Sequence, residues 1–267
     1  MSFPTDMVII PGGWHTPASY RKFTTALSAA FPSIRVTVLP LPSITNDPSP
    51  TADFYTDSAF VRSSVSQMIS EGRRLAILMH SYGGQVGSNA LHGLYREEKS
   101  GGGITHLIHL AAAMLFPNSL MSAPYGDSKP NVSLNPADFN FLPDGRVVAL
   151  HPVEMWIGTE AGDKGEATDQ EIEEYVGTIT PIATKVVSQK TEHAAWMDGK
   201  EEGGPKVVYV MTAKDISVPY ELQKWMVERA REEVGVDVKT VRMKTGHVPT
   251  LTRTGELVRV LGEVLEE

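Results

Sequence analysis

The sequence contains no cysteine in its 267 residues. Disulfide bonds, thiolate metal sites and a cysteine nucleophile are therefore excluded. No histidine is paired with carboxylates at a metal-ligand spacing such as His-Glu-x-x-His, so we expect neither a metal ion nor another cofactor.

Positive charge is scarce and scattered along the chain. The formal net charge is −8, and lysine and arginine form no blocks, which argues against a nucleic acid or an anionic membrane as partner. The sequence also lacks an apolar run long enough to cross a bilayer, and its first residues lack the basic region of a signal peptide. We expect a cytoplasmic monomer or homodimer whose partner is a small-molecule substrate.

Short apolar runs alternate with segments of helical spacing through most of the chain. Such alternation is typical of an α/β protein with a mostly parallel, doubly wound sheet. The predicted strands are 7–10, 34–39, 74–80, 104–112, 206–211 and 236–243. The predicted helices are 17–31, 61–69, 86–94, 219–234 and 255–265.

This alternation stops between about Phe116 and Gly204, where Pro, Asn, Ser and Asp are frequent. Residues 139–150 predict a small hairpin that turns at Asp144-Gly145, and 152–156 and 168–188 are helical candidates. We interpret 116–204 as a mainly helical cap, or lid, inserted into a core that is formed by 1–115 and 205–267.

The run from 74 to 80 ends at a serine, Ser81, and is followed by two glycines and a helical pattern. This is the layout of a nucleophile elbow, a sharp turn that raises a serine hydroxyl above the end of a sheet. The strained turn needs small residues two positions away on either side. Gly83 satisfies this need and Met79 does not. The alternative is an ordinary strand-to-helix loop that contains a serine.

Asp215 and His247 each lie four residues beyond the end of a later predicted strand. A serine nucleophile needs a base, and the base needs a group that orients it. In α/β hydrolases these residues occur in the order serine, acid, histidine, beyond the carboxyl ends of strands. Each residue alone could be an ordinary loop residue, but order and placement together favour a Ser81–Asp215–His247 triad.

Acyl transfer also requires backbone donors for an oxyanion. One donor is predicted at Tyr82, which follows the serine, and the other at Gly13, in the loop after the first strand. An apolar substrate site is predicted from large side chains in or near the cap. They can equally be core residues, and this alternative stays open. These candidates are Trp14, Met114, Met121, Trp156 and Trp196.

The chain resembles the α/β-hydrolase superfamily along nearly its whole length. More narrowly, it is similar to the branch of plant methylesterases and hydroxynitrile lyases and to related fungal serine hydrolases. The resemblance implies an eight-stranded, mostly parallel sheet with a helical cap, the triad named above, and Tyr82 and Gly13 as oxyanion donors. The segments that carry the resemblance are 11–15, 80–84, 194–196, 215, 223–226 and 246–247.

Four positions depart from patterns of that branch. Pro11 replaces the usual histidine of the first loop, and Met79 replaces the usual elbow glycine. The threonine and the lysine of the lyases are absent, because Gly12 and Val248 occupy their positions. These two absences favour hydrolysis.

The predicted function is a serine hydrolase that cleaves a small or medium apolar carboxylic ester or lactone through an acyl-enzyme. One alternative is a non-hydrolytic enzyme of the same fold that performs C–C bond cleavage, cyclisation or dehydration in a biosynthetic pathway. A second alternative is a ligand receptor with little turnover.

Overall fold

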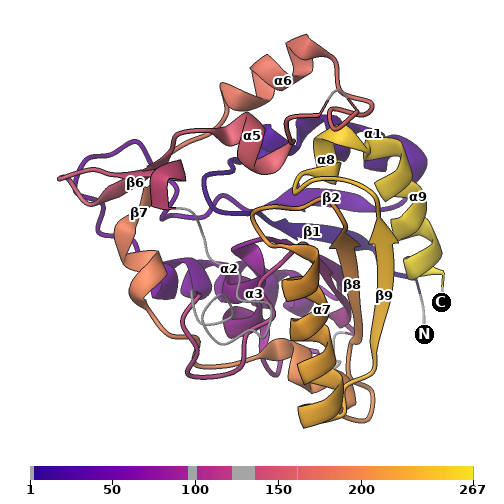
Figure 1. Cartoon of the computed structure of the whole chain (residues 1–267). Helices are drawn as coiled ribbons and strands as arrows, with labels where there is room; N and C mark the ends of the chain where they lie inside the picture. Colours follow the sequence, from indigo (N-terminus) through magenta and orange to yellow (C-terminus); the bar gives the residue numbers. More distant parts are fainter. Residues whose placement is uncertain (1–2, 96–100, 122–135, 161, 267) are drawn as a thin grey trace.

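The computed structural model describes residues 3–95, 101–121, 136–160 and 162–266 (Figure 1). Its main sheet has six strands, and every neighbouring pair is parallel. The mostly parallel sheet predicted from the sequence is therefore confirmed. In spatial order the strands are β2 (Arg35–Val38), β1 (Asp6–Ile10), β3 (Arg74–His80), β4 (Gly103–Leu110), β8 (Lys206–Thr212) and β9 (Val238–Met243).

The strand count differs from the eight that the family resemblance implied. The described residues form six strands in this sheet, with β2 and β9 at its edges. A strand of a parallel sheet covered on both faces needs its own nearly continuous apolar run. The four inner strands, β1, β3, β4 and β8, have such runs, whereas the edge strands β2 and β9 include exposed polar residues.

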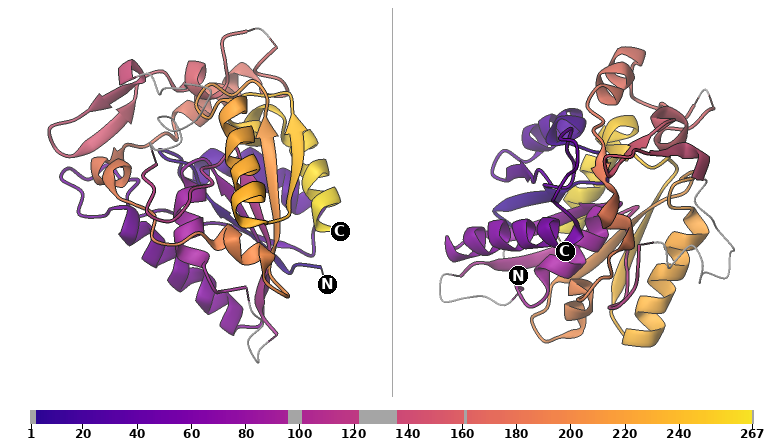
Figure 2. Two further views of the ribbon diagram at one scale, coloured as in Figure 1. Left: turned by 60° about the horizontal axis from the view of Figure 1, so that its bottom comes forward. Right: turned by 90° about the vertical axis from the view of Figure 1, so that its left-hand side faces the viewer.

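Helices cover both faces of the sheet (Figures 1 and 2). Met7 and Ile9 point to the face covered by α1 (Arg21–Ala30) and α9 (Thr254–Leu265). Val8 and Ile10 point to the opposite face, which is covered by α2 (Phe54–Ser70), α3 (Gly83–Leu91) and, further along, α7 (Tyr220–Arg229). This arrangement is the predicted doubly wound fold. No helix in the described ranges combines the length and apolarity that a bilayer span requires.

The described part of the region predicted as a cap combines short helices with a small antiparallel sheet. The hairpin is present as β5 (Phe139–Phe141) and β6 (Arg146–Ala149), and β7 (Ile182–Ala183) adds a third antiparallel strand. The helices include α5 (Pro152–Trp156), α6 (Asp169–Val176) and short 3-10 helices at Thr184–Ser188 and Ala195–Lys200.

Helix α6 starts at a capping box formed by Thr168 and Glu171 and ends well before residue 188, where the sequence pattern placed its end. Gly177 follows it directly, and Pro181 has no backbone N–H with which to continue a helix. The cap boundaries stay a prediction, because 122–135 and 161 lie outside the described residues.

The region predicted as a cap, hereafter called the cap, is bonded to the loops that follow β1 and β2. Ala183 donates its backbone N–H to the Ser43 carbonyl at 2.8 Å. Thr180 donates to the Trp14 carbonyl at 2.9 Å, and the Trp14 indole donates to the Val147 carbonyl at 2.8 Å. The chain moves from β1 to β2 on one side and then to β3 on the other, so the loops after β1 and β3 flank the topological switch point. Open α/β sheets place their ligand sites at such a point.

Met79 is accommodated by a glycine one turn into α3. Its side chain is fully buried, and a Cβ atom added to Gly87 would lie 2.5 Å from its sulfur. Gly83 and Gly84 are constrained as tightly, since added Cβ atoms would lie 2.3 Å from the Ile10 carbonyl oxygen and 2.4 Å from that of Ala113. The room usually left by a glycine before the serine is therefore provided by Gly87.

We predict that Gly87→Ala destabilises the protein by about 1–3 kcal/mol, although alanine is the better helix former. Overpacking against Met79 is the physical reason. In chemical denaturation, Met79→Ala combined with Gly87→Ala should cost less than the sum of the two single changes. Gly255→Ala is the control, because an added Cβ there meets its nearest atom at 3.5 Å. A neutral or stabilising Gly87→Ala would contradict this account.

Candidate active site

Ser81 occupies a strained turn between β3 and α3. Its φ is 53°, in the left-handed region that non-glycine residues avoid. Its backbone is held on both sides, because Ser81 N–H donates to the Leu110 carbonyl and the Ser81 carbonyl accepts from Gly84 and Ala113 at 3.0 Å each. The strand–turn–helix context that the elbow motif requires is thus present.

His247 and Asp215 are joined directly by a hydrogen bond. The distance from His247 Nδ1 to Asp215 Oδ2 is 2.7 Å, and the two residues are 1% and 5% exposed. The other carboxylate oxygen accepts the N–H groups of Ser217 and Val218 at 2.9 Å each, and Thr212 donates its hydroxyl to Oδ2 at 2.7 Å. A carboxylate acceptor assigns the imidazole proton to Nδ1, so Nε2 is the basic nitrogen.

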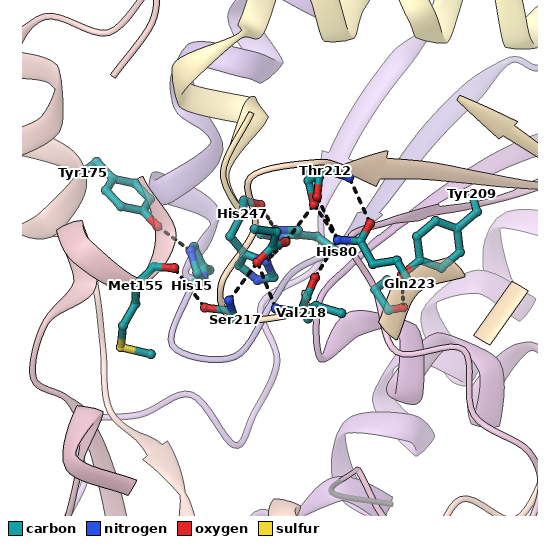
Figure 3. A network of polar contacts seen from close by, with 12 residues as sticks. His15, His80, Met155, Tyr175, Tyr209, Thr212, Ser217, Val218, Gln223 and His247 are labelled. Atoms are coloured by element: carbon teal, nitrogen blue, oxygen red, sulfur yellow. Dashed lines mark hydrogen bonds and ion pairs between the residues drawn. The ribbon is translucent and has the colours of Figure 1, made fainter. Parts of the chain in front are cut away.

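A buried glutamine from α7 fixes the acid loop (Figure 3). Gln223 donates to the Thr212 hydroxyl at 2.9 Å and to the Val218 carbonyl at 2.6 Å, and it accepts the Thr212 N–H at 2.9 Å. Asp215 lies between these two anchored residues. Its orientation toward His247 is therefore set by the core helix and the end of β8.

Ser81 and His247 meet in the wall of one cavity of about 260 Å³. No hydrogen bond joins them in the described part of the chain, as is common in enzymes before a substrate binds. None of the lining residues is lysine, arginine, aspartate or glutamate. The lining residues are Gly13, Trp14, His15, Ser81, Tyr82, Met121, Phe139, Phe141, Val147, Met155, Trp156, Ile182, Val186, Val187, Ser217, Val218 and His247.

Three of the five large residues suggested by the sequence, Trp14, Met121 and Trp156, line this cavity. Met114 and Trp196 do not, which corrects that expectation. Both are buried in the core under α7, where the Trp196 indole donates to the Leu115 carbonyl at 3.0 Å. The cavity residues in the β5–β7 sheet were not predicted. Strands this short have too few residues for an alternating pattern to show which side chains face the cavity.

Gly13 and Tyr82 bring two backbone N–H groups together. The Gly12 carbonyl accepts the His15 N–H at 3.2 Å, so the Gly13 N–H of the same trans peptide points the opposite way. A Cβ atom added to Gly13 would lie 3.7 Å from Tyr82 Cβ. Among the described residues neither N–H has a protein acceptor. Both groups are therefore available to an oxyanion.

His15 is a site residue whose role the sequence did not reveal. Its Nδ1 lies 2.6 Å from the Gly13 carbonyl oxygen, and its Nε2 lies 2.6 Å from the hydroxyl of Tyr175 in α6. The carbonyl can only accept, so His15 donates from Nδ1 and accepts from Tyr175. Burial lowers the pKa of His15 to about 3, so the ring is neutral. This contact ties the cap to the loop that bears Gly13.

No metal site accompanies this arrangement in the ranges that the structure describes, where no three His, Asp or Glu side chains converge as ligands. The arrangement instead contains the parts that acyl transfer uses: a hydroxyl on a strained turn, an imidazole with a carboxylate partner, and two free N–H groups.

A buried carboxyl group lies behind Tyr82. Asp57, which is 0% exposed, accepts hydrogen bonds from the Tyr82 hydroxyl at 2.9 Å, the Ser43 N–H at 2.8 Å and the Ser43 hydroxyl at 2.5 Å. Burial raises the pKa of Asp57 to about 6 and outweighs these donors. Ser43 is also the residue on which cap strand β7 docks.

We predict that Asp57→Asn removes a pH-dependent loss of stability. The folded pKa of about 6 exceeds the ordinary value of 3.8, so the folded state binds more protons between these values. The stability of the native protein relative to Asp57→Asn should therefore fall as the pH rises, by up to about 3 kcal/mol between pH 4 and pH 7. Urea denaturation of both proteins across this range measures the difference. A difference that does not vary with pH would refute the prediction.

Comparison with known proteins agrees with this geometry. A profile of the alpha/beta hydrolase family matches residues 7–260. An alpha/beta hydrolase of Aspergillus novofumigatus is 23% identical over 281 aligned residues, which cover 97% of this chain and 98% of that protein.

Solved structures show the same fold. A pyrethroid hydrolase from Sphingobium faniae is similar with a TM-score of 0.70 at 19% identity, over 98% of this chain and 97% of that one. A methylesterase from Arabidopsis gives 0.70 at 18% identity over 98% of each chain. The resemblance inferred from the sequence is confirmed, and the chain belongs to the alpha/beta hydrolase family.

Proposed function

We propose that this protein is a serine hydrolase that cleaves a small or medium apolar carboxylic ester or lactone through an acyl-enzyme. The observation that carries the proposal is the His247–Asp215 hydrogen bond of 2.7 Å, in a cavity whose wall also includes Ser81. This bond holds the proton on Nδ1 and leaves Nε2 as a base. A serine on an elbow is the group that such a base activates.

In the proposed reaction, His247 Nε2 accepts the Ser81 hydroxyl proton while Oγ attacks the ester carbonyl carbon. Asp215 stabilises the imidazolium, and the N–H groups of Gly13 and Tyr82 bind the oxyanion. The intermediate collapses, the C–O bond to the alcohol breaks, and His247 returns the proton to the leaving alkoxide. Water, deprotonated by His247, then attacks the acyl-enzyme, which releases the carboxylic acid and restores Ser81.

The composition of the cavity supports an uncharged, apolar substrate. Its wall has no lysine, arginine, aspartate or glutamate, and the polar groups of Trp14 and His15 are already bonded within the protein. A charged substrate would lose its hydration in this cavity without gaining a partner. Relatives described as a methylesterase and a pyrethroid hydrolase are consistent with this substrate class.

Labelling with a phosphonofluoridate tests the mechanism. We expect a mass increase on Ser81 of the native protein and none in Ser81→Ala, because only the activated hydroxyl attacks phosphorus. With p-nitrophenyl esters and lactones as substrates, Ser81→Ala should lower kcat by at least about 10³-fold, and Asp215→Asn by about 10⁴-fold.

A native protein that stays unlabelled would overturn the proposal. Product analysis in the same screen separates the alternatives. Turnover in which a carbon framework is rearranged or cut would indicate a non-hydrolytic enzyme, and tight ligand binding without turnover would indicate a receptor.

The cap hairpin should select the length of the substrate. Phe141 lines the cavity although it is 56% exposed, so it lies at the cavity mouth. We predict that Phe141→Ala raises KM about tenfold for esters with long acyl chains and leaves acetate esters nearly unchanged, since only a long chain reaches this ring. Leu150→Ala is the matched control, because Leu150 is 46% exposed at the end of the same hairpin but does not line the cavity. Equal effects of the two changes at every chain length would refute the prediction.

A further inference from the structure

A chain of three buried hydrogen bonds connects Gly12, Tyr20, His80 and the backbone of His247. The Gly12 N–H lies 2.9 Å from the Tyr20 hydroxyl, and that hydroxyl lies 2.7 Å from His80 Nδ1. His80 Nε2 lies 3.0 Å from the backbone carbonyl oxygen of His247. Tyr20, His80 and His247 are each at most 1% exposed, so water does not compete for these groups.

Every proton in this chain has one allowed position. The His247 carbonyl can only accept, so a neutral His80 carries its one ring proton on Nε2 and accepts at Nδ1. The Tyr20 hydroxyl therefore donates to Nδ1, and its oxygen accepts the Gly12 N–H. Burial, together with the nearby His247 and His15, keeps the pKa of His80 well below its ordinary value, and burial raises that of Tyr20. The chain is neutral and runs in one direction.

The three bonds connect three of the four loops that the proposed reaction uses; the fourth is the loop of Asp215. Gly12 precedes the oxyanion donor Gly13, His80 precedes Ser81, and the last acceptor is His247 itself. The approach is close, because a Cβ atom on Gly12 would lie 3.1 Å from both His80 Nδ1 and Ser81 Cβ.

The strand ladder alone cannot set this geometry. The base loop follows β9, and two strands, β4 and β8, separate β9 from β3. Each pair of neighbouring strands adds its own twist, and these twists accumulate across the sheet. The relative position of the loops that follow β3 and β9 therefore depends on every strand pair between them. The bond from His80 to the His247 carbonyl spans this gap directly, and the two rings lie 4.9 Å apart between centroids.

We propose that Tyr20 and His80 form a positioning relay that holds the oxyanion loop and the base loop at fixed places relative to Ser81. The proposal rests on the hydrolase function proposed above. Both loops act on groups that develop in the transition state, so loss of the relay should lower kcat and leave KM nearly unchanged.

The test compares Tyr20→Phe with Tyr209→Phe. Tyr209 is also fully buried, and its hydroxyl donates to the Ala112 carbonyl at 2.8 Å, so each change removes one buried hydroxyl. We expect similar losses in denaturation midpoint. Only Tyr20→Phe should lower kcat for a p-nitrophenyl ester, by about 10- to 100-fold, with KM within about twofold of the native value.

If Tyr20→Phe does not fold, two variants of His80 test the relay instead. The amide of His80→Gln can still donate to the His247 carbonyl, whereas His80→Phe cannot, so kcat should rank native, then His80→Gln, then His80→Phe. In ¹⁵N NMR spectra of the native protein, His80 should show the Nε2–H tautomer, which is independent of turnover.

The outcomes separate the relay from the proposed function. A native protein that phosphonofluoridate does not label overturns the hydrolase and the catalytic role of the relay with it. A labelled native protein overturns the relay alone if Tyr20→Phe retains its kcat, if both tyrosine variants lose kcat equally, or if His80 shows the Nδ1–H tautomer.

Discussion

The left-handed backbone at Ser81 is the constraint on which the rest of the structure depends. A residue held at φ 53° costs of order 1–3 kcal/mol, and it persists only where its surroundings determine it fully. Here β1 and the loop after β4 pack directly on the turn, so Gly83 and Gly84 have no space for a side chain. Met79 adds bulk on the strand side, and Gly87 removes bulk on the helix side. The elbow therefore depends on the combined volume of the side chains that β3 and α3 place around it. The positions of the glycines in the Gly-x-Ser-x-Gly motif describe only part of this requirement.

Around this turn the protein keeps its histidines in different states. His15 and His80 are buried without a carboxylate partner, and their pKa values lie far below the ordinary value, partly because a charge on His247 would repel a second one. Among these three histidines, His247 alone has a carboxylate, Asp215, beside it. In the proposed reaction, that carboxylate stabilises the imidazolium that forms when His247 accepts the serine proton. The neutral His15 and His80 act through hydrogen bonds to loop backbones.

The sequence predicted those features of the fold and of the candidate site that depend on local residue patterns. Strand-length patterns predicted all six strands of the main sheet, and Asp215 and His247 follow two of them that are neighbours in the sheet. It did not reveal contacts between distant segments. Met114 and Trp196 are large apolar residues of the kind that line pockets, but both are buried in the core under α7. The bond from His15 to Tyr175 spans 160 residues, and no periodicity encodes it. The described residues form six strands in the main sheet, whereas the expected eight came from the family resemblance and not from runs in this sequence.

The wall of the cavity comes from two parts of the protein, the ends of the core strands and the β5–β7 sheet, and different contacts hold each part in place. The groups proposed for chemistry lie at the ends of core strands and are fixed by Gln223, by buried backbone bonds and by the sheet. Much of the apolar wall comes from the small β5–β7 sheet, which is joined to the core through Trp14 and Ser43. A two-residue strand such as β7 has few ladder bonds, so its position is determined mainly by these two loops. The first loop contains Gly13 itself, and Ser43 is linked to Tyr82 through Asp57. In the proposed reaction, a substrate that displaces the β5–β7 sheet would therefore also disturb the two proposed oxyanion donors.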